Sequence, residues 1–173
     1  MKKINIRSIA IMAMLIAVSV VLSRILGFYL TPSMRVSFDY FPIILAGICF
    51  GPAAGALVGG LADFIGSTMI SGLGFYPPLI IGPVFAGLIS GLLAQYTFHH
   101  DMNRWWKYMV VSCAADILCN LLWGTVALSM LYGSPFGAYL LVRAPLKLAI
   151  AVIDAQLVCA VHRALRPTLS MWQ

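Results

Sequence analysis

Residues Arg24–Pro52 read RILGFYLTPSMRVSFDYFPIILAGICFGP, and this stretch decides how the chain is organised. An apolar helix is expected to end here, with Arg24 near its exit. A polar and aromatic loop with a second basic residue, Arg35, follows it. A further apolar segment then runs to Gly51-Pro52. Two arginines in so apolar a setting indicate a binding site rather than a solvated face.

The composition indicates an integral membrane protein with a single domain. The chain has 173 residues, of which 62% are hydrophobic and 9% charged, and its mean hydropathy is +0.98. Soluble domains carry about 25% charged residues. The net charge of +6 does not indicate nucleic-acid binding, because the basic residues stand at the ends of apolar runs, where they set membrane topology.

The apolar runs predict an all-α membrane protein with six transmembrane helices. Residues 39–72 would form a helix of about 51 Å, longer than the roughly 30 Å hydrocarbon layer. We therefore expect a break at Gly51-Pro52. The expected helices span about 8–28, 39–50, 52–72, 78–98, 105–131 and 135–165, within one domain covering 1–173. This count places most Lys and Arg on the side of both termini, so both termini are predicted to be cytoplasmic.

Small residues follow helical spacing in several of these segments. In the first helix Ala10, Ala13 and Ala17 share one face, which would allow another helix to approach closely. Spacing alone favours packing within the bundle over docking to a partner. Gly51, Gly55 and Gly59 repeat at every fourth position, and we assign them to close helix packing.

Basic side chains within the bilayer converge on its outer half. The predicted topology places Arg24, Arg35, Arg143 and Lys147 there, whereas Asp63 and Asp116 lie near mid-depth and Asp154 lies toward the inner side. Lys147 is expected to pair with Asp116 or Asp63, and Arg35 with Asp39. Arg24 and Arg143 are left without an obvious acidic partner, and an anionic ligand would complete such a pocket, since Arg grips a carboxylate through two parallel hydrogen bonds.

Groups suited to a flat heterocycle occur in the same layer. Asp116, Asn120 and Trp123 would share one face of an α-helix, and Phe75 and Tyr76 lie in a glycine-flanked loop. A carboxylate and an amide can read a donor–acceptor edge while an aromatic ring stacks on its plane. The sequence holds no HExxH, no Gly-x-Ser-x-Gly and no phosphate-binding loop. We expect a binding protein that is not an enzyme and has no cofactor or catalytic metal.

Eight stretches in the same order resemble the substrate-binding S components of energy-coupling factor (ECF) vitamin transporters, most closely the folate-specific branch. They are Ser23–Leu26, Pro32–Phe38, Phe50–Pro52, Ala62–Gly66, Gly74–Pro77, Asn120–Trp123, Ser129–Tyr132 and Arg143–Lys147. The resemblance implies a six-helix protein of the bacterial plasma membrane that captures a vitamin from outside. It further implies a transmembrane coupling protein (T component) and two cytoplasmic ATPases as partners. One departure is Pro77-Pro78-Leu79, where a single proline is expected.

The resemblance also assigns roles to residues. An Ala-x-x-x-Ala face contacts the coupling protein in this family, so Ala13 and Ala17, beside Ala10, become a docking face, against the preference from spacing. Phe75 and Tyr76 match a gating loop. For folate, Asp63, Asp116 or Asn120 would read the pterin, Trp123 and the loop aromatics would stack, and the basic residues would hold the anionic end. Alternatives are pantothenate, a queuosine precursor, a facilitator working alone, or a small intramembrane enzyme acting on lipid.

Overall fold

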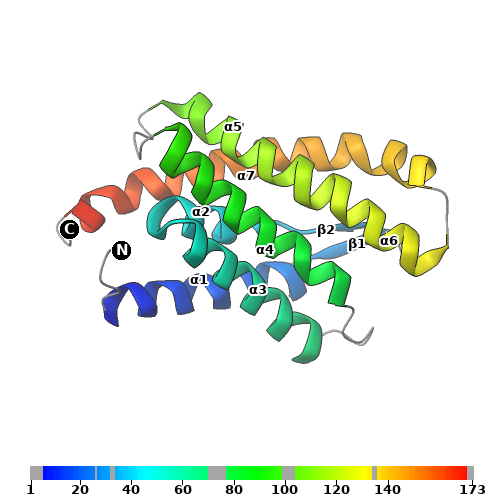
Figure 1. Cartoon of the computed structure of the whole chain (residues 1–173), viewed down its shortest axis with the longest axis horizontal. Coiled ribbons are helices and arrows are strands. Elements are labelled where there is room, and N and C mark those ends of the chain that lie inside the picture. The colour runs from blue at the N-terminus through cyan, green and yellow to red at the C-terminus, as the bar shows by residue number, and fades with distance from the viewer. Residues whose placement is uncertain are drawn as a thin grey trace.

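The computed structural model describes residues 6–25, 27–31, 34–69, 77–98, 104–133 and 136–170 of the chain. Its helices form an elongated bundle in which the start of α1 and the end of α7 lie at the same end (Figure 1). The elements are α1 (Ile6–Arg24), β1 (Phe28–Thr31), β2 (Met34–Val36), α2 (Tyr40–Phe50), α3 (Pro52–Met69), α4 (Pro77–Leu92), η1 (Leu93–Thr97), α5 (Trp105–Ala115), η2 (Asp116–Trp123), α6 (Gly124–Tyr132) and α7 (Phe136–Ser170).

Membrane-length helices account for most of the described chain. Four spans are long and apolar enough to cross a bilayer, namely Ile6–Arg24, Pro78–Thr97, Trp105–Met130 and Leu140–Leu165. The helix Tyr40–Phe50 is apolar but shorter. An α-helical membrane protein is therefore the architecture of this chain.

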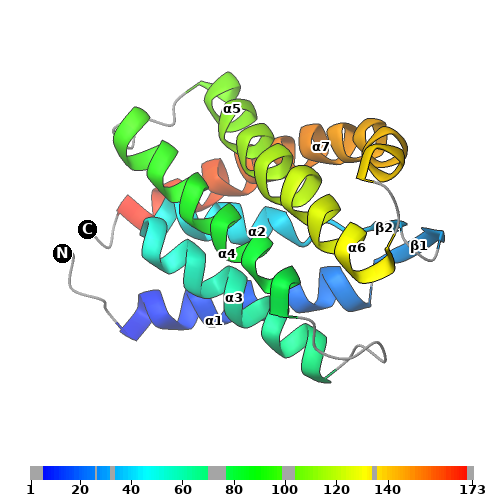
Figure 2. The same ribbon diagram turned by 45° about the vertical axis from the view of Figure 1, so that its right-hand side comes forward.

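A two-stranded hairpin follows α1, and the sequence did not lead us to expect it. β1 pairs antiparallel with β2, with Phe28 opposite Val36 and Tyr29 opposite Arg35. The first helix therefore ends at Arg24 rather than near Phe28. Pairing satisfies backbone groups that a helix through Phe28 would have satisfied internally. The hairpin lies at the bundle end opposite the start of α1 (Figure 2).

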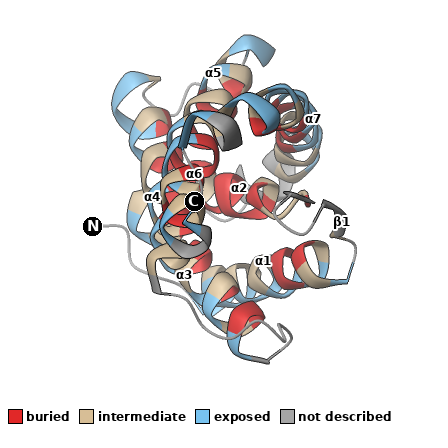
Figure 3. Cartoon of the chain, turned by 90° about the vertical axis from the view of Figure 1, so that its right-hand side faces the viewer, coloured by how far each residue is buried: buried red, intermediate tan, exposed pale blue. Residues whose placement is uncertain are grey.

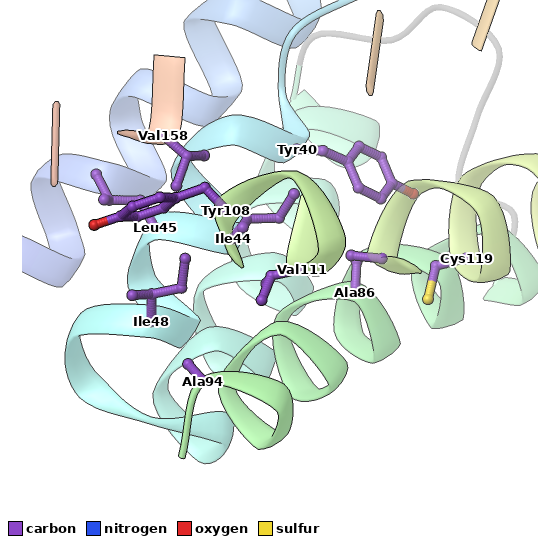
Figure 4. Close-up of a cluster of buried hydrophobic side chains, with 11 residues drawn as sticks. Tyr40, Ile44, Leu45, Ile48, Ala86, Ala94, Tyr108, Val111, Cys119 and Val158 are labelled. Atoms are coloured by element: carbon purple, nitrogen blue, oxygen red, sulfur yellow. The ribbon is translucent and has the colours of Figure 1, made fainter. Parts of the chain in front are cut away.

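Helix α2 is the buried centre of the bundle. It packs against α1, α3, α4 and α7, and the seven consecutive residues from Pro42 to Ile48 are buried. Figure 3 shows the buried segments of the outer helices facing inward around it. The side chains of Tyr40, Ile44, Leu45 and Ile48 meet those of neighbouring helices in one apolar core (Figure 4). Gly51, with φ of +98°, turns the chain from α2 into α3 in a conformation that L side chains rarely adopt.

Helices α3 and α4 pack backbone to backbone. A Cβ on Gly87 would overlap the carbonyl of Gly55, and a Cβ on Gly59 would overlap the carbonyl of Pro83. We call these residues, with Gly91 against Pro52, the glycine-packed interface. The prediction that the glycines serve close helix packing is confirmed for Gly55 and Gly59. It is wrong for Gly51, which makes the turn and where a Cβ would meet only Gln95 at 3.9 Å.

The long helix from Trp105 to Tyr132 is not α-helical throughout. Its middle, η2, is a π-helix of eight residues flanked by α5 and α6. π-helical turns use i→i+5 hydrogen bonds and commonly occur at functional sites. They also change which residues share a face of the helix.

Candidate functional site

Buried polar side chains gather where η2 and α6 pack against α7. We call this set the polar cluster: Asp116, Asn120, Thr125, Arg143 and Lys147, each of which is buried. Arg143 and Lys147 are both only 7% exposed. Burial of two cations on one helix is costly in a membrane protein, and such residues commonly mark a ligand pathway.

One part of the polar cluster joins a carboxylate, an amide and an ammonium group. Asn120 Nδ2 donates to Asp116 Oδ1 at 3.5 Å, across one turn of η2. Lys147 on α7 attracts Asp116, one of its two predicted partners, electrostatically. The second carboxylate oxygen of Asp116 is buried without a hydrogen-bond partner among the described residues. That oxygen and the Asn120 amide offer a donor–acceptor pair to a ligand.

Arg143 reaches across to the start of α6. Its Nη1 donates to Thr125 Oγ1 at 3.2 Å, and the Thr125 hydroxyl in turn donates to the carbonyl of Leu121. The guanidinium passes close to Gly124, where a Cβ would lie 3.7 Å from Nη2. Among the described contacts of Arg143, the side-chain partner is therefore a neutral hydroxyl group on α6.

Arg24 is paired with an acid, and the prediction that it lacks an obvious partner is wrong. Its Nη2 donates to Asp63 Oδ1 at 3.4 Å, which joins the end of α1 to α3. Gly66, one turn after Asp63, leaves room for the guanidinium, since a Cβ there would crowd Arg24 Nε. The two residues are 39 positions apart in the chain, so sequence spacing could not predict that they form a pair.

Trp123 is hydrogen-bonded to α4, and the prediction that it shares a face with Asp116 and Asn120 assumed α-helical spacing. Its Nε1 donates to the carbonyl of Pro78 in the first turn of α4 at 2.8 Å, and its ring is 37% exposed. Because η2 is a π-helix, α-helical spacing does not hold here, although Asn120 still lies beside Asp116. Trp123 thus joins η2 to α4.

For several other predicted site residues, the structure describes the backbone position only, or does not describe the residue. Arg35 lies on β2, but its side chain is outside the described part, and so is the predicted Arg35–Asp39 pair. Asp39, at the start of α2, accepts a hydrogen bond from Ser37 Oγ at 2.6 Å. Phe75 and Tyr76 lie outside the described residues. Ala10, Ala13 and Ala17 are all exposed along α1.

Two buried residues near the site, Thr125 and Asp154, were not predicted as site residues from the sequence. Thr125 was not singled out, because a lone Thr in an apolar helix carries no signal of its own. Asp154 on α7 was noted only as a deep acid, yet it is fully buried and interacts electrostatically with Asp116 and Lys147. Its spacing of seven from Lys147 along α7, two helical turns on the same face, is the signal that would have linked them.

The chemistry of the site favours binding over metal coordination or catalysis. Among the residues that the structure describes, no group of three or more His, Cys, Asp or Glu side chains is placed to hold a metal ion. The polar cluster instead combines cations for an anion with a carboxylate–amide edge for a polar heterocycle.

Known proteins resemble this chain over most of its length. The family model for the ECF transporter substrate-specific component matches residues 7–162. The folate transporter FolT of Leuconostoc mesenteroides subsp. mesenteroides is 30% identical over 132 residues, which cover 75% of this chain and 68% of that protein. The folate transporter FolT of Clostridium novyi (strain NT) is 26% identical over 133 residues, 77% of this chain and 73% of that protein.

Solved structures share the fold. The crystal structure of FolT bound with folic acid superposes with a TM-score of 0.78 at 26% identity, covering 92% of this chain and 95% of that one. The S component for biotin from an ECF-type ABC transporter gives a TM-score of 0.70 at 17% identity, over 91% and 92% of the two chains, which shows a shared fold alone. This chain is therefore an integral membrane protein that belongs to the family of substrate-specific components of ECF transporters.

Proposed function

We propose that this protein is the folate-binding component of an ECF transporter. The polar cluster carries the proposal: buried Arg143 and Lys147 stand beside the Asp116–Asn120 pair, in the chemistry that a folate molecule requires. Folate combines a flat pterin, rich in donors and acceptors, with a dicarboxylate tail. Likeness to two folate transporters and to a folate-bound structure supports the same ligand. Membership in a transporter family also confirms the expectation that the chain is not an enzyme.

Each part of the ligand has a proposed partner. Asp116 and Asn120 read the pterin edge, while Arg143 and Lys147 hold the carboxylates, because Arg and Lys are the residues that bind such anions. Arg24 and Asp63 form a wall of the site as an ion pair. Trp123, Phe75 and Tyr76 supply aromatic surface, and Arg35 adds positive charge at the rim.

We further propose six membrane crossings with both termini in the cytoplasm, in a single domain covering 1–173. The start of α1 and the end of α7 lie at one end of the bundle, as an even number of crossings requires (Figure 1). Lys107, Arg104 and Arg163 belong to segments at this same end, which fits the positive-inside rule. In this arrangement α2 and α3 are two of the six crossings, separated by the turn at Gly51.

A transmembrane coupling protein and two cytoplasmic ATPases are the proposed partners, and the lipid bilayer surrounds the complex. The family supports this module. The exposed Ala10, Ala13 and Ala17 on α1 form a smooth surface on which another membrane helix can pack closely. The T component is the proposed occupant of that surface.

Titration of the purified protein with folate, followed by tryptophan fluorescence, tests the proposal. Trp123 belongs to η2, the element that carries Asp116 and Asn120, so bound folate should quench its emission, and Trp123→Phe identifies its share of the signal. We expect saturable binding at or below micromolar folate. An absence of binding at micromolar folate, or displacement of bound folate by pantothenate at equal concentration, would reject folate as the ligand.

A further inference from the structure

Thr125 is fully buried at the point where the π-helix η2 returns to α-helical geometry. The N–H of Gly124 contacts the carbonyls of both Cys119 and Leu121 at this junction. The Thr125 hydroxyl donates to that same Leu121 carbonyl. A hydroxyl group has one proton, so this bond commits it, and the oxygen lone pairs are directed elsewhere as acceptors.

Arg143 uses this acceptor. Its Nη1 donates to Thr125 Oγ1 at 3.2 Å, from a helix 18 residues further along the chain. Because the guanidinium is planar and its donors form a rigid fork, fixing one Nη group sets the direction of the others. The guanidinium packs against the same turn of α6, since a Cβ at Gly124 would lie in ordinary van der Waals contact with Nη2 at 3.7 Å.

The contact differs from that of the other arginine near the site. Arg24 is held by the carboxylate of Asp63, which offsets its charge. Thr125 is neutral, so it orients Arg143 without contributing a negative charge. A carboxylate that reaches Arg143 then finds a cation that is already aligned, and pre-alignment reduces the entropy lost on binding.

We propose that Thr125 is a positioning residue that holds the Arg143 guanidinium in the orientation that receives a folate carboxylate. This inference rests on the proposed function. Thr125 itself does not touch the ligand, so its effect on affinity passes through Arg143 and concerns the charged tail of folate alone.

The test compares two ligands on purified full-length protein, by tryptophan fluorescence titration. Folate carries the two tail carboxylates, whereas its diamide keeps the size and removes the charges. Thr125→Val keeps the shape of the side chain and removes the acceptor. We expect it to weaken folate binding up to about tenfold, the cost of ordering one long side chain on binding, and to leave diamide affinity within about twofold.

Matched variants separate positioning from general damage. Thr125→Ser retains the hydroxyl and should restore folate affinity to within about twofold of wild type. Thr68→Val is the control, because the Thr68 hydroxyl makes the same bond to the residue four before it, Phe64, on the exposed side of α3. In an Arg143→Ala background, Thr125→Val should add almost nothing, since coupled residues are not additive. Should Thr125→Val not fold, Thr125→Ala takes its place with the same expected results.

The outcomes distinguish the two proposals. If wild type does not bind folate, the proposed function fails and this inference fails with it. If wild type binds folate but Thr125→Val keeps its affinity, loses both ligands equally, or adds fully to Arg143→Ala, the positioning role alone is overturned.

Discussion

Helices α3 and α4 meet through bare backbone, whereas η2 and α6 meet α7 through buried polar side chains. The glycine-packed interface brings the carbonyl of Gly55 against Gly87, with no room for a side chain. The polar cluster places Arg143, Lys147 and Asp116 between helices of the same bundle. The first region is therefore built from glycines without side chains, and the second from long charged and polar side chains.

This difference separates stability from recognition. Small residues let helices approach closely and gain dispersion contacts, which is a main source of helix association in a bilayer. Buried charge offers no such gain and is retained where a ligand uses it. Substitutions in the glycine-packed interface should therefore affect folding, and substitutions in the polar cluster should affect binding.

The largest effect is expected from Gly87→Leu. Its side chain would overlap the Gly55 carbonyl, and backbone cannot move aside as a side chain tip can. We expect a loss of about 3 kcal/mol or more in the free energy of unfolding, seen as a much lower melting temperature in detergent. Gly137→Leu on α7 is the control, because a Cβ there meets nothing within 4 Å. Equal melting temperatures for the two variants would contradict the close-packing account.

Arg143→Ala should have the next largest effect, and on binding rather than folding. Loss of one partner of a buried, hydrogen-bonded ion pair with the ligand costs about 2–5 kcal/mol, or at least about 30-fold in Kd. Fluorescence titration with folate measures the affinity, and the melting temperature of the ligand-free protein shows whether the fold is kept. Unchanged affinity would remove Arg143 from the site.

Tyr108→Phe should have a smaller effect, confined to stability. The Tyr108 hydroxyl and His162 Nδ1 are hydrogen-bonded at 2.6 Å, near the ends of α5 and α7 remote from the polar cluster. We expect a loss of about 1 kcal/mol in the free energy of unfolding and no change in folate affinity. A clear drop in affinity would show that the two ends of this helix pair are coupled.

Ala13→Trp should have the smallest effect on the isolated protein. Ala13 is exposed on α1, so a bulky ring there disturbs no internal packing. Melting temperature and folate affinity should match wild type, while folate uptake with the coupling protein and ATPases should be lost. An unaffected uptake rate would reject α1 as the docking face.

Much of the fold could be predicted from the sequence because it depends on local signals. Apolar length placed the helices, and Gly51-Pro52 marked the turn between α2 and α3. The hairpin at 28–36 was missed, since its strands are short and its residues also suit the end of a membrane helix. The π-helix was missed as well, because the residue types at 116–123 fit an α-helix, with i→i+4 hydrogen bonds, as well as a π-helix, with i→i+5 bonds.

The sequence predicted most of the polar residues of the site, but it predicted few of the contacts between them. Asp116, Asn120, Arg143 and Lys147 were selected because polar groups within apolar helices are costly, and the structure brings them together. The Arg24–Asp63 pair and the Arg143–Thr125 bond could not be read from sequence, since each joins residues far apart in the chain. The face on which Trp123 lies could not be predicted, because residues 116–123 form a π-helix rather than an α-helix.

Mass spectrometry of the small molecule carried by the purified protein tests the central claim most directly. The protein would be produced in folate-containing medium, purified in mild detergent and then denatured to release its ligand. We predict a folate in roughly stoichiometric amount from wild type, and much less from Arg143→Ala of equal melting temperature. A folded wild-type protein that releases no folate, or releases a different vitamin in that amount, would contradict the account.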